Sequence, residues 1–466
     1  MDLGGFTAVD WFVLVQHELF LFAAAFFLIG AVDEIAIDAI YLWLRITGRV
    51  GREERLGPCI EGAALAGPTA IFIPAWRESR VIGVTIRHAL AAWPQAELRL
   101  YVGCYRNDHE TPAAALVGAD GDSRVRIIRH DRDGPTCKAD CLNQLYQALE
   151  RDEQLEGWWA RMVVLHDAED MVDPAALKLM ERALEGAAFV QLPVMALPRP
   201  GSRWIGGHYT DEFAEVHGKT MVVRDALGAG VPGAGVGCAI ERDVLHRLSV
   251  RNHGEPFAAG SLTEDYELGL DIAALGGRTR FVRAHAADGR LVATRAYFPS
   301  NVHDAVRQKT RWVHGVALQS WDRLGWRGGF RDVWMQMRDR RGPLAAMLLG
   351  LAYVLVILSG AQIALAAIGI VPSIRLSPLL ETVLFLNLAA LAWRALMRSC
   401  FTARDFGWRE GLFAIPRTLV SNVIAIIAGR RAIAAYLRTL MGEPVRWEKT
   451  EHRDHPALAE APAATS

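Results

Sequence analysis

The chain has 466 residues, enough for two or three domains, and its 52% hydrophobic content and mean hydropathy of +0.14 are high for a wholly soluble protein. A membrane part is therefore expected. The formal net charge is −1, so no overall positive field attracts nucleic acid, and we expect no nucleic-acid partner.

The six cysteines form neither a disulfide framework nor a zinc knuckle, because only one pair stands close together, at helical spacing. We interpret all six as reduced thiols in a cytoplasmic body. They are Cys59, Cys104, Cys137, Cys141, Cys238 and Cys400.

The first apolar run lies near the amino terminus. Leu19 to Val32 is uncharged but short for a membrane span, and adding Trp11 to Glu18 gives the required length of about 20 residues. An amphipathic interfacial helix is the alternative, because His17 and the next glutamate interrupt the run. Met1 to Asp10 lacks a basic residue and no cleavage site follows, so we expect an uncleaved anchor over residues 1–44.

Charged residues follow this anchor. Asp33, Glu34 and Asp38 would be expensive in lipid, so we expect them at the cytoplasmic boundary, facing protein. The arginines that come next place the following chain in the cytoplasm and the amino terminus outside, by the positive-inside rule. These arginines are Arg45, Arg49, Arg52 and Arg55.

From Gly67 to about Leu291, short apolar runs alternate with helical patterns, which predicts an α/β domain with a mostly parallel sheet and helices on both faces. We assign this domain to residues 45–320. Polar clusters at 74–78, 104–108 and 166–170 follow three of the runs, so we expect them together at the carboxyl edge of the sheet, where ligands bind. The runs are Ala70–Ile73, Leu98–Val102, Val125–Ile128, Met162–Leu165 and Phe189–Leu192.

Further membrane elements are expected over residues 344–440. Leu344 to Ile370 is uncharged and long enough to span a bilayer, and Leu379 to Trp393 is a second candidate. Leu412 to Ala428 is interrupted by polar residues, so an interfacial or re-entrant helix is slightly favoured over a fourth span. Arginines after the second span indicate an external loop between the two spans and a return to the cytoplasm.

Two segments flank these helices. Residues 321–343 mix tryptophans with arginines, which is typical of a membrane surface, where rings lie at headgroup level and cations meet anionic lipid. Nucleic-acid binding is the alternative, but it is disfavoured because a span follows directly. Residues 441–466 are expected to be a cytoplasmic tail, disordered from Pro456.

Three short motifs point to the chemistry. In chain order they are Asp167-Ala168-Glu169-Asp170, Thr263-Glu264-Asp265 and Gln308-Lys309-Thr310-Arg311-Trp312. Carboxylates can hold a divalent cation or deprotonate an acceptor hydroxyl, while cationic and amide groups stabilise a departing pyrophosphate. A tryptophan adds a flat apolar face on which a sugar ring can stack. Together the motifs predict sugar transfer from a nucleotide donor.

With these motifs the chain resembles the membrane-integrated family 2 glycosyltransferases, which include cellulose and hyaluronan synthases. A narrower resemblance, to the glycosyltransferase part of the phage adsorption protein B type, rests on His166–Asp170, Gly134–Asn143 and Trp447-x-Lys449-Thr450-x-His452. The likeness runs over almost the whole chain. It implies a GT-A fold, a nucleotide-sugar donor and a divalent cation, Mg²⁺ or Mn²⁺.

The resemblance implies roles for the acidic motifs. In the family an Asp-x-Asp at a strand end coordinates the cation, so Asp167 is expected at the metal together with either Glu169 or Asp170. A helix-capping acidic loop is the alternative. Asp265 is expected to be the general base, with Glu264 beside it, and a plain helix start is the alternative there.

The remaining candidates surround the donor and the acceptor. Gln308 and Arg311 share one helix face, and the planar guanidinium suits phosphate oxygens, so both are expected at the donor. Trp312 is expected at the acceptor sugar, unless the motif is only an amphipathic helix end. Lys138, at a turn into a helix, is expected at the donor diphosphate. Gly235, in a glycine-rich stretch, would permit a close backbone approach to the acceptor.

The nucleotide pocket and the cellular role also follow from the resemblance. Pro74, Glu78 and Asp108 would line the base and ribose pocket, with a surface salt bridge as the alternative for the two acids. We expect an inverting enzyme in a bacterial inner membrane, with its catalytic domain in the cytoplasm. It would move a sugar, preferably from a UDP-sugar, to a growing polysaccharide or lipid-linked acceptor, with an export partner or a homo-oligomer. Single-sugar transfer to a lipid carrier and a catalytically silent scaffold for export or phage uptake are the alternatives.

Overall fold

The structure, a computed structural model, describes residues 8–50, 54–370, 376–444 and 454–460. The motif Trp447-x-Lys449-Thr450-x-His452 lies outside these described residues, as do Arg52 and the centre of the predicted external loop. All six cysteines are free thiols.

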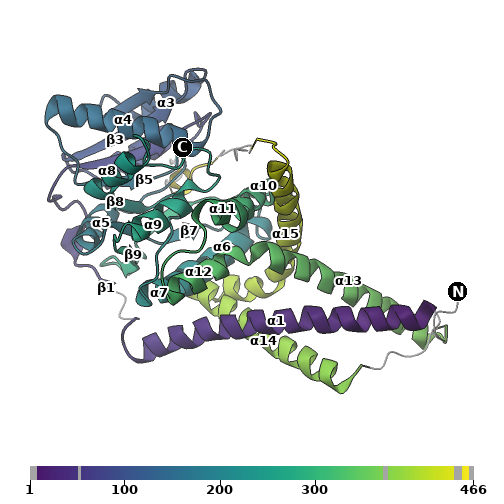
Figure 1. The fold of residues 1–466 in the computed structure, drawn as a ribbon. Helices are drawn as coiled ribbons and strands as arrows, with labels where there is room; N and C mark the ends of the chain where they lie inside the picture. The colour runs from purple at the N-terminus through teal and green to yellow at the C-terminus, as the bar shows by residue number, and fades with distance from the viewer. Residues whose placement is uncertain (1–7, 51–53, 371–375, 445–453, 461–466) are drawn as a thin grey trace, which may run out of the picture.

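A seven-stranded sheet forms the centre of the domain (Figure 1). Its order is β4-β3-β2-β5-β8-β6-β9, and only β8 runs antiparallel to its neighbours β5 and β6. All five predicted strands are present, which confirms the predicted α/β class and its mostly parallel sheet. The strands are β2 (Thr69–Pro74), β3 (Leu98–Cys104), β4 (Val125–Arg129), β5 (Met162–Leu165), β6 (Phe189–Gln191), β8 (Cys238–Glu241) and β9 (Thr279–Phe281).

Two parallel two-stranded sheets and a set of helices surround this sheet. The small sheets pair β1 (Glu54–Arg55) with β10 (Ala284–His285) and β7 (Val194–Ala196) with β11 (Thr294–Ala296). The helices are α2 (Ile82–Ala92), α3 (Glu110–Ala119), α4 (Lys138–Glu156), α5 (Ala176–Leu184), α6 (Ile205–Glu215), α7 (Met221–Ala226), α8 (Arg242–Arg251), α9 (Glu264–Ala274), α10 (Val302–Trp312), α11 (Ser320–Leu324) and α12 (Phe330–Arg340), with shorter turns η1 (Pro58–Ile60), η2 (Val216–Thr220) and η3 (Val313–Gln319).

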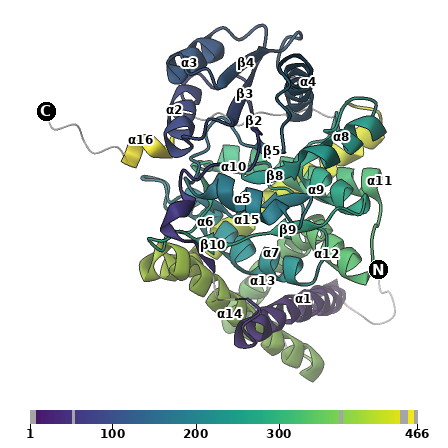
Figure 2. The same cartoon turned by 90° about the vertical axis from the view of Figure 1, so that its left-hand side faces the viewer.

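Alternate residues of β2 enter separate cores on the two faces of the sheet. Ala70 and Phe72 pack with residues of α4, whereas Ile71 and Ile73 pack with residues of α2 and α3. Figure 2 shows α2 and α3 on one side of β2 to β4 and α4 on the other. Because both faces are buried, the strands are uninterrupted apolar runs.

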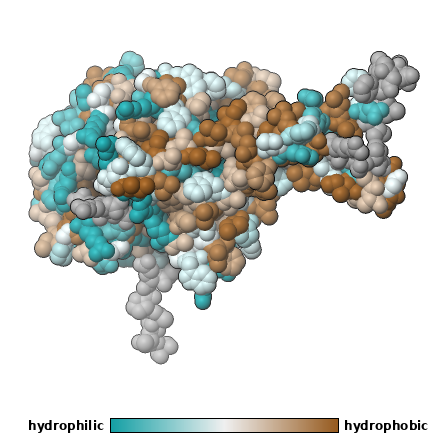
Figure 3. Space-filling view, turned by 90° about the horizontal axis from the view of Figure 1, so that it is seen from below, coloured by the Kyte–Doolittle hydropathy of each residue, from teal (hydrophilic) through white to brown (hydrophobic). Residues whose placement is uncertain are grey.

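Four helices are long and apolar enough to cross a membrane. In Figure 1, α1 and α13 run side by side away from the sheet, and Figure 3 shows the resulting arm largely in the colour of hydrophobic residues. The four are α1 (Ala8–Ile46), α13 (Gly342–Ala367), α14 (Pro378–Phe406) and α15 (Trp408–Leu440).

The acids of α1 face protein, as predicted. Lys219 in η2 is fully buried, and its Nζ lies 2.6 Å from Asp38, 2.9 Å from Glu215 and 3.3 Å from Glu34. The carboxylate of Asp33 bonds to arginines at the end of α12. This buried charge network links the first apolar helix to the α/β domain.

Helix α15 runs unbroken through Pro416 and lies along the domain. Arg417 is 1% exposed and pairs with Asp211 of α6 at 2.7 Å. Further along, Ile424 packs into a core shared with α6 and α10, and the Tyr436 hydroxyl donates to the Asp322 carboxylate of α11 at 2.7 Å. The helix therefore contacts the domain over most of its length.

The described part of the tail is ordered. Residues Pro456–Glu460 form helix α16, which packs against α2. The prediction of disorder from Pro456 is therefore wrong for this stretch, because it finds a tertiary contact that composition does not reveal. Residues 461–466 lie outside the described residues.

Candidate active site

Three loops meet at the carboxyl edge of the sheet, where β2, β3 and β5 end. These strands are parallel neighbours, with Phe72 opposite both Tyr101 and Leu165. The prediction that the polar clusters after these strands share one edge is therefore confirmed.

Lys138 is the first residue of α4 and lies where the acidic motifs converge. Its Nζ is 2.5 Å from Asp167 Oδ1 and donates to the Gly235 carbonyl oxygen at 3.1 Å. Burial lowers the pKa of Lys138, but the negative charges of Asp167, Glu264 and Asp265 together raise it above its ordinary value. The ammonium group thus joins the 167–170 motif to the Glu264-Asp265 pair.

The Asp170 carboxylate bonds within its own loop. Its side chain is almost fully buried, and its Oδ2 accepts from the Asp167 backbone N–H at 2.9 Å and lies 2.9 Å from His166 Nδ1. Burial raises the pKa of Asp170, and His166 offsets this in part. The expectation that Asp170 could reach a metal is corrected, because its carboxylate holds the loop in shape. Asp167 and the half-buried Glu169 remain as candidate ligands.

The donor set at this edge suits a hard cation. Within the described residues, no three His, Cys, Asp or Glu side chains are grouped to hold a metal ion. Protein-bound Mg²⁺ is usually held by one or two carboxylates, with substrate phosphates and water completing its shell. Asp167 and Glu169 on one loop match that pattern, so the residues present fit Mg²⁺ or Mn²⁺ brought with a diphosphate.

The stretch from Gly233 to Gly237 passes directly beside Asp265. Gly235 has a φ of +80°, and a Cβ there would lie 2.6 Å from Asp265 Oδ2, so glycine is required. The side-chain amide of Gln191 fixes the stretch by donating to the Val236 carbonyl and accepting from a nearby backbone N–H, both at 2.8 Å. Sequence reasoning missed this glutamine. The close approach at Gly235 is to the Asp265 carboxylate. Contact of Gly235 with an acceptor stays a prediction.

The Glu264-Asp265 pair opens helix α9. The preceding Thr263 makes no side-chain cap, so a capped helix start does not account for the motif. Burial, and then the charge of Asp265, raises the pKa of Glu264 to about 7, and burial also raises the pKa of Asp265 against the opposing effect of Lys138. A carboxylate whose pKa approaches neutrality is suited to accept a proton.

Helix α10 brings two further candidates toward this pair. The positive charge of Arg311 lowers the pKa of both Glu264 and Asp265, so the guanidinium lies within electrostatic reach. Gln308 is 9% exposed, and its Oε1 has no hydrogen-bond partner within the described parts of the chain. A buried amide oxygen without a donor is costly and is available to a ligand.

The ring of Trp312 packs in an aromatic cluster. Its centroid lies 6.1 Å from that of Tyr209, 6.2 Å from Phe213 and 6.3 Å from Phe298, all edge to face. Lys309 Nζ lies 4.7 Å from the ring centroid. The half-buried ring therefore contributes to packing, and stacking on an acceptor sugar stays a prediction.

This packing predicts the effect of removing the ring. Trp312→Ala should lower the free energy of unfolding by about 3 kcal/mol, the lower end for a large core ring, because this ring is half-buried. Trp312→Phe should keep most of the stability. Thermal unfolding measures the effect, with the exposed Trp159→Ala as control. A Trp312→Ala protein as stable as the control would contradict the packing role, and shortened products from a folded variant would support acceptor stacking.

The acids expected in the nucleotide pocket tie two loops together. Asp108 Oδ2 accepts from the Arg77 N–H at 2.6 Å, and Asp108 Oδ1 accepts from the Thr111 N–H at 3.2 Å. The Glu78 N–H donates to the Thr111 hydroxyl at 2.9 Å. Both acids are buried rather than at the surface. Pro74 ends β2 at the same edge, and contact of all three with a nucleotide stays a prediction.

The tail reaches the loop of residues 166–170, which sequence reasoning missed. His455 is 1% exposed, and its Nε2 lies 3.2 Å from the Asp170 carbonyl oxygen. A single histidine in an Ala- and Pro-rich tail gives no sequence signal for this contact. The loop that carries Asp167 is therefore held both by its own Asp170 side chain and by His455 of the tail.

Fold and site together define a glycosyltransferase of the GT-A class. Residues 66–315 match the family described as Glycosyltransferase like family 2, and the chain belongs to that family. It is 31% identical over 462 residues to Bacteriophage adsorption protein B of Escherichia coli strain K12, and equally to Bacteriophage N4 adsorption protein B of Escherichia coli O157:H7. The narrower resemblance is thus confirmed. These alignments cover 93% of this chain, which spans 62% of the length of each curated relative.

A solved structure is similar in fold. It is the mannosyltransferase PcManGT from Pyrobaculum calidifontis, in complex with GDP-Man and Mn²⁺. The TM-score is 0.51, with 16% sequence identity, and the match covers 87% of this chain and 99% of that chain. At this identity the likeness concerns the fold.

Proposed function

We propose that the chain is an inverting glycosyltransferase that moves a sugar from a nucleoside diphosphate sugar to a growing polysaccharide or lipid-linked acceptor. A UDP-sugar is the favoured donor. The observation that carries the proposal is the meeting of Lys138, Asp167 and Gly235 with Glu264 and Asp265 at the carboxyl edge of the sheet. Residues from distant parts of the chain converge there on one point, as substrate sites in such folds do.

The donor half of the site is proposed around Asp167. Asp167 and Glu169 would hold Mg²⁺ or Mn²⁺, which offsets negative charge on the leaving diphosphate when bound. Lys138 and Arg311 donate to phosphate oxygens, the latter through a planar fork. Gln308 supplies its amide to the donor. The residues proposed for the base and ribose are Pro74, Glu78 and Asp108.

The acceptor half is proposed around Asp265. Its carboxylate removes the proton of the acceptor hydroxyl, and that oxygen attacks the anomeric carbon from the face opposite the diphosphate. The bond from the anomeric carbon to the diphosphate oxygen breaks with its electron pair on the diphosphate, so the configuration inverts. Burial of the Glu264-Asp265 pair raises both pKa values and favours proton uptake. Trp312 would lie against the acceptor sugar.

Removing the metal should abolish turnover, and removing its main proposed ligand should weaken it. Excess EDTA is expected to stop nucleotide release, and Asp167→Ala should weaken nucleotide binding and raise the Mn²⁺ concentration needed for half-maximal rate. Asp131→Ala, an exposed acid on a neighbouring loop, is the control and should behave as wild type. Undiminished activity in EDTA would remove the metal from the mechanism.

We propose a bacterial inner-membrane location with the catalytic domain in the cytoplasm. Helices α1, α13 and α14 would cross the bilayer, and α15 would lie at its surface. Between Arg417 and Tyr436 α15 rises roughly 28 Å, and both residues bond to the domain, so this helix has no free length with which to cross. The three crossings alone are few for a secretion channel, so an export partner or a homo-oligomer is proposed for polysaccharide release.

Reporter fusions test this arrangement. A reporter after Gly57 and another after Pro456 should both report cytoplasm, whereas one inserted within residues 371–375 should report the outside. A tail found outside would make α15 a true span, with Arg417 carried into the bilayer. Product length in the same membranes separates polysaccharide extension from single-sugar transfer to a lipid carrier.

A further inference from the structure

Three arginines lie at the end of α12, and one of them, Arg340, differs from the other two in its hydrogen bonds. Arg338 bonds to Asp33 and, at 2.9 Å, to Glu34, while Arg341 bonds to the same acids at 2.5 and 2.8 Å. None of the three guanidinium nitrogens of Arg340 has a hydrogen-bond partner in the described chain. Because α13 begins two residues later, Arg340 lies at the start of a proposed membrane span.

Arg340 is buried in spite of this, with 6% of its surface exposed. Its guanidinium carbon lies 4.5 Å from the ring centroid of Trp326 and 6.0 Å from that of Trp321. These two rings meet edge to face at 5.4 Å, and each tryptophan is 46% exposed, so together they form an outer wall over the arginine. Cation–π contact offsets part of the charge but provides no acceptor for the N–H groups.

The adjacent acid in the chain forms its hydrogen bonds with other groups. The Asp339 carboxylate accepts from Arg224 Nη1 at 2.9 and 3.0 Å and from the Tyr266 hydroxyl at 2.8 Å. Burial lowers the pKa of Arg340, the nearby Tyr266 and Asp339 oppose this in part, and the positive charge of Arg327 lowers the pKa further. A guanidinium stays charged at neutral pH, so burial without an acceptor is costly, and a bound anion would relieve that cost.

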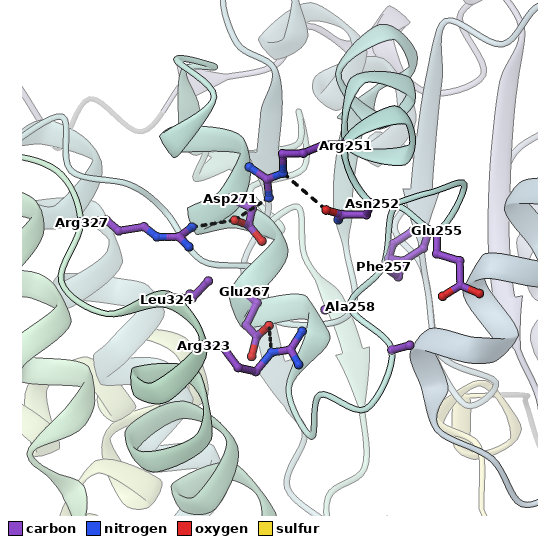
Figure 4. Close-up of a pocket in the computed structure, with 11 residues that line it drawn as sticks. Arg251, Asn252, Glu255, Phe257, Ala258, Glu267, Asp271, Arg323, Leu324 and Arg327 are labelled. Carbon is purple, nitrogen blue, oxygen red and sulfur yellow. Dashed lines mark hydrogen bonds and ion pairs between the residues drawn. The ribbon is translucent and has the colours of Figure 1, made fainter.

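Nearby arginines are already paired with acids. They line a cavity of about 280 Å³ in which Arg251 and Arg327 point to Asp271, and Arg323 points to Glu267 (Figure 4). These pairs lie at 2.8–2.9 Å. The cavity therefore has no unpaired cation to offer an anion, in contrast to Arg340.

The loop that carries Trp326 is held in place through its backbone. Gly325 and Gly328, with φ of +60° and +84°, shape the loop around Trp326. The Gln336 side chain accepts from the Arg327 N–H at 3.3 Å and donates to the Arg327 carbonyl at 2.7 Å. These contacts hold the loop, so access of a ligand to the arginine would require rotation of a tryptophan ring.

We propose that Arg340 is the base of a binding site for the phosphate of an anionic phospholipid, with Trp321 and Trp326 beside it at headgroup level. Phosphate oxygens accept two parallel N–H groups from one guanidinium, and tryptophan rings favour the headgroup region. The place at the start of α13 favours a lipid, because headgroups are concentrated there. Through Asp339 and Tyr266 the site also adjoins α9, which carries Asp265.

The test uses the full chain in nanodiscs of phosphatidylcholine, with or without phosphatidylglycerol. Native mass spectrometry counts retained phosphatidylglycerol, and thermal unfolding gives the midpoint. Wild type should retain this lipid and unfold at a higher temperature in its presence. Arg340→Gln should lose this gain, with affinity for the lipid lower by about tenfold or more, as for loss of a charge-assisted hydrogen bond. In phosphatidylcholine alone its midpoint should equal or exceed that of wild type, because an unpaired buried charge is removed.

Arg331→Gln is the matched control, because Arg331 is an exposed arginine of the same helix, and it should behave as wild type. Inorganic phosphate added to phosphatidylcholine nanodiscs separates the two sources of phosphate. An Arg340-dependent gain with inorganic phosphate as large as that with the lipid would overturn the lipid assignment. Equal lipid retention by wild type and Arg340→Gln would overturn the site. A lower midpoint of Arg340→Gln in phosphatidylcholine would also overturn it, by assigning the arginine to packing against Trp326.

Discussion

Asp265→Asn should lower the rate of sugar transfer roughly 10²–10⁴-fold, the usual contribution of a general base. The change keeps the size of the side chain but removes its ability to accept the proton of the acceptor hydroxyl. Because Asp265 lies beside Gly235 and the Glu264 carboxyl remains, the fold and the donor contacts should persist. Turnover of a labelled nucleotide sugar measures the rate, and nucleotide titration measures donor binding.

A matched control lies on the same helix. Asp271→Asn changes an acid of α9 that pairs with Arg251 and Arg327, away from the converging motifs, and should leave transfer near the wild-type rate. Near-normal turnover by Asp265→Asn would remove Asp265 from the mechanism. Loss of nucleotide binding in that variant would instead assign the aspartate to the donor.

Lys219→Met should cost about 3–5 kcal/mol of folding stability, the usual effect of breaking a buried charge pair. The lysine is fully buried, and its removal leaves Glu34, Asp38 and Glu215 without the cation they share. Glu34 and Glu215 keep arginine partners, but the buried Asp38 loses the cation it pairs with, and the three carboxylates repel one another. Since two of them belong to α1, the contact between this helix and the catalytic domain should loosen.

Thermal unfolding of the detergent-solubilised protein measures this loss. Lys178→Met serves as control, because Lys178 is more exposed and pairs with one acid, Glu181. A Lys219→Met midpoint equal to that of the control would show that the buried network adds nothing to stability. Protease sensitivity of the link between α1 and the domain should rise in Lys219→Met only.

The sheet could be predicted because strands buried on both faces are uninterrupted apolar runs, as at Met162 to Leu165. Strands β8 and β9 escape this reasoning, because they have four and three residues and contain Glu241 and Arg280. Such short polar-ended strands are held by their neighbours rather than by their own composition. The parallel order of the strands also predicted that the polar clusters meet at the carboxyl edge of the sheet.

The directions of individual side chains could not be predicted. The sequence left open whether Glu169 or Asp170 lies beside Asp167 at the metal, and only the structure places the Asp170 carboxylate against His166. Trp312 is compatible with stacking on a sugar until the aromatic residues of other elements are placed around it. The acids of α1 were expected to face protein, but their partner Lys219 is 181 residues from Asp38, a distance over which sequence patterns give no pairing.

The most direct measurement is nucleotide release by membranes that contain the protein, screened over UDP-, GDP- and CMP-sugars with Mn²⁺ present. The proposed function predicts release from at least one donor, UDP-sugars first, at a rate that falls at least about a hundredfold in Asp265→Asn. Absence of release from every donor in the wild-type membranes, or equal release in Asp265→Asn membranes, would contradict it.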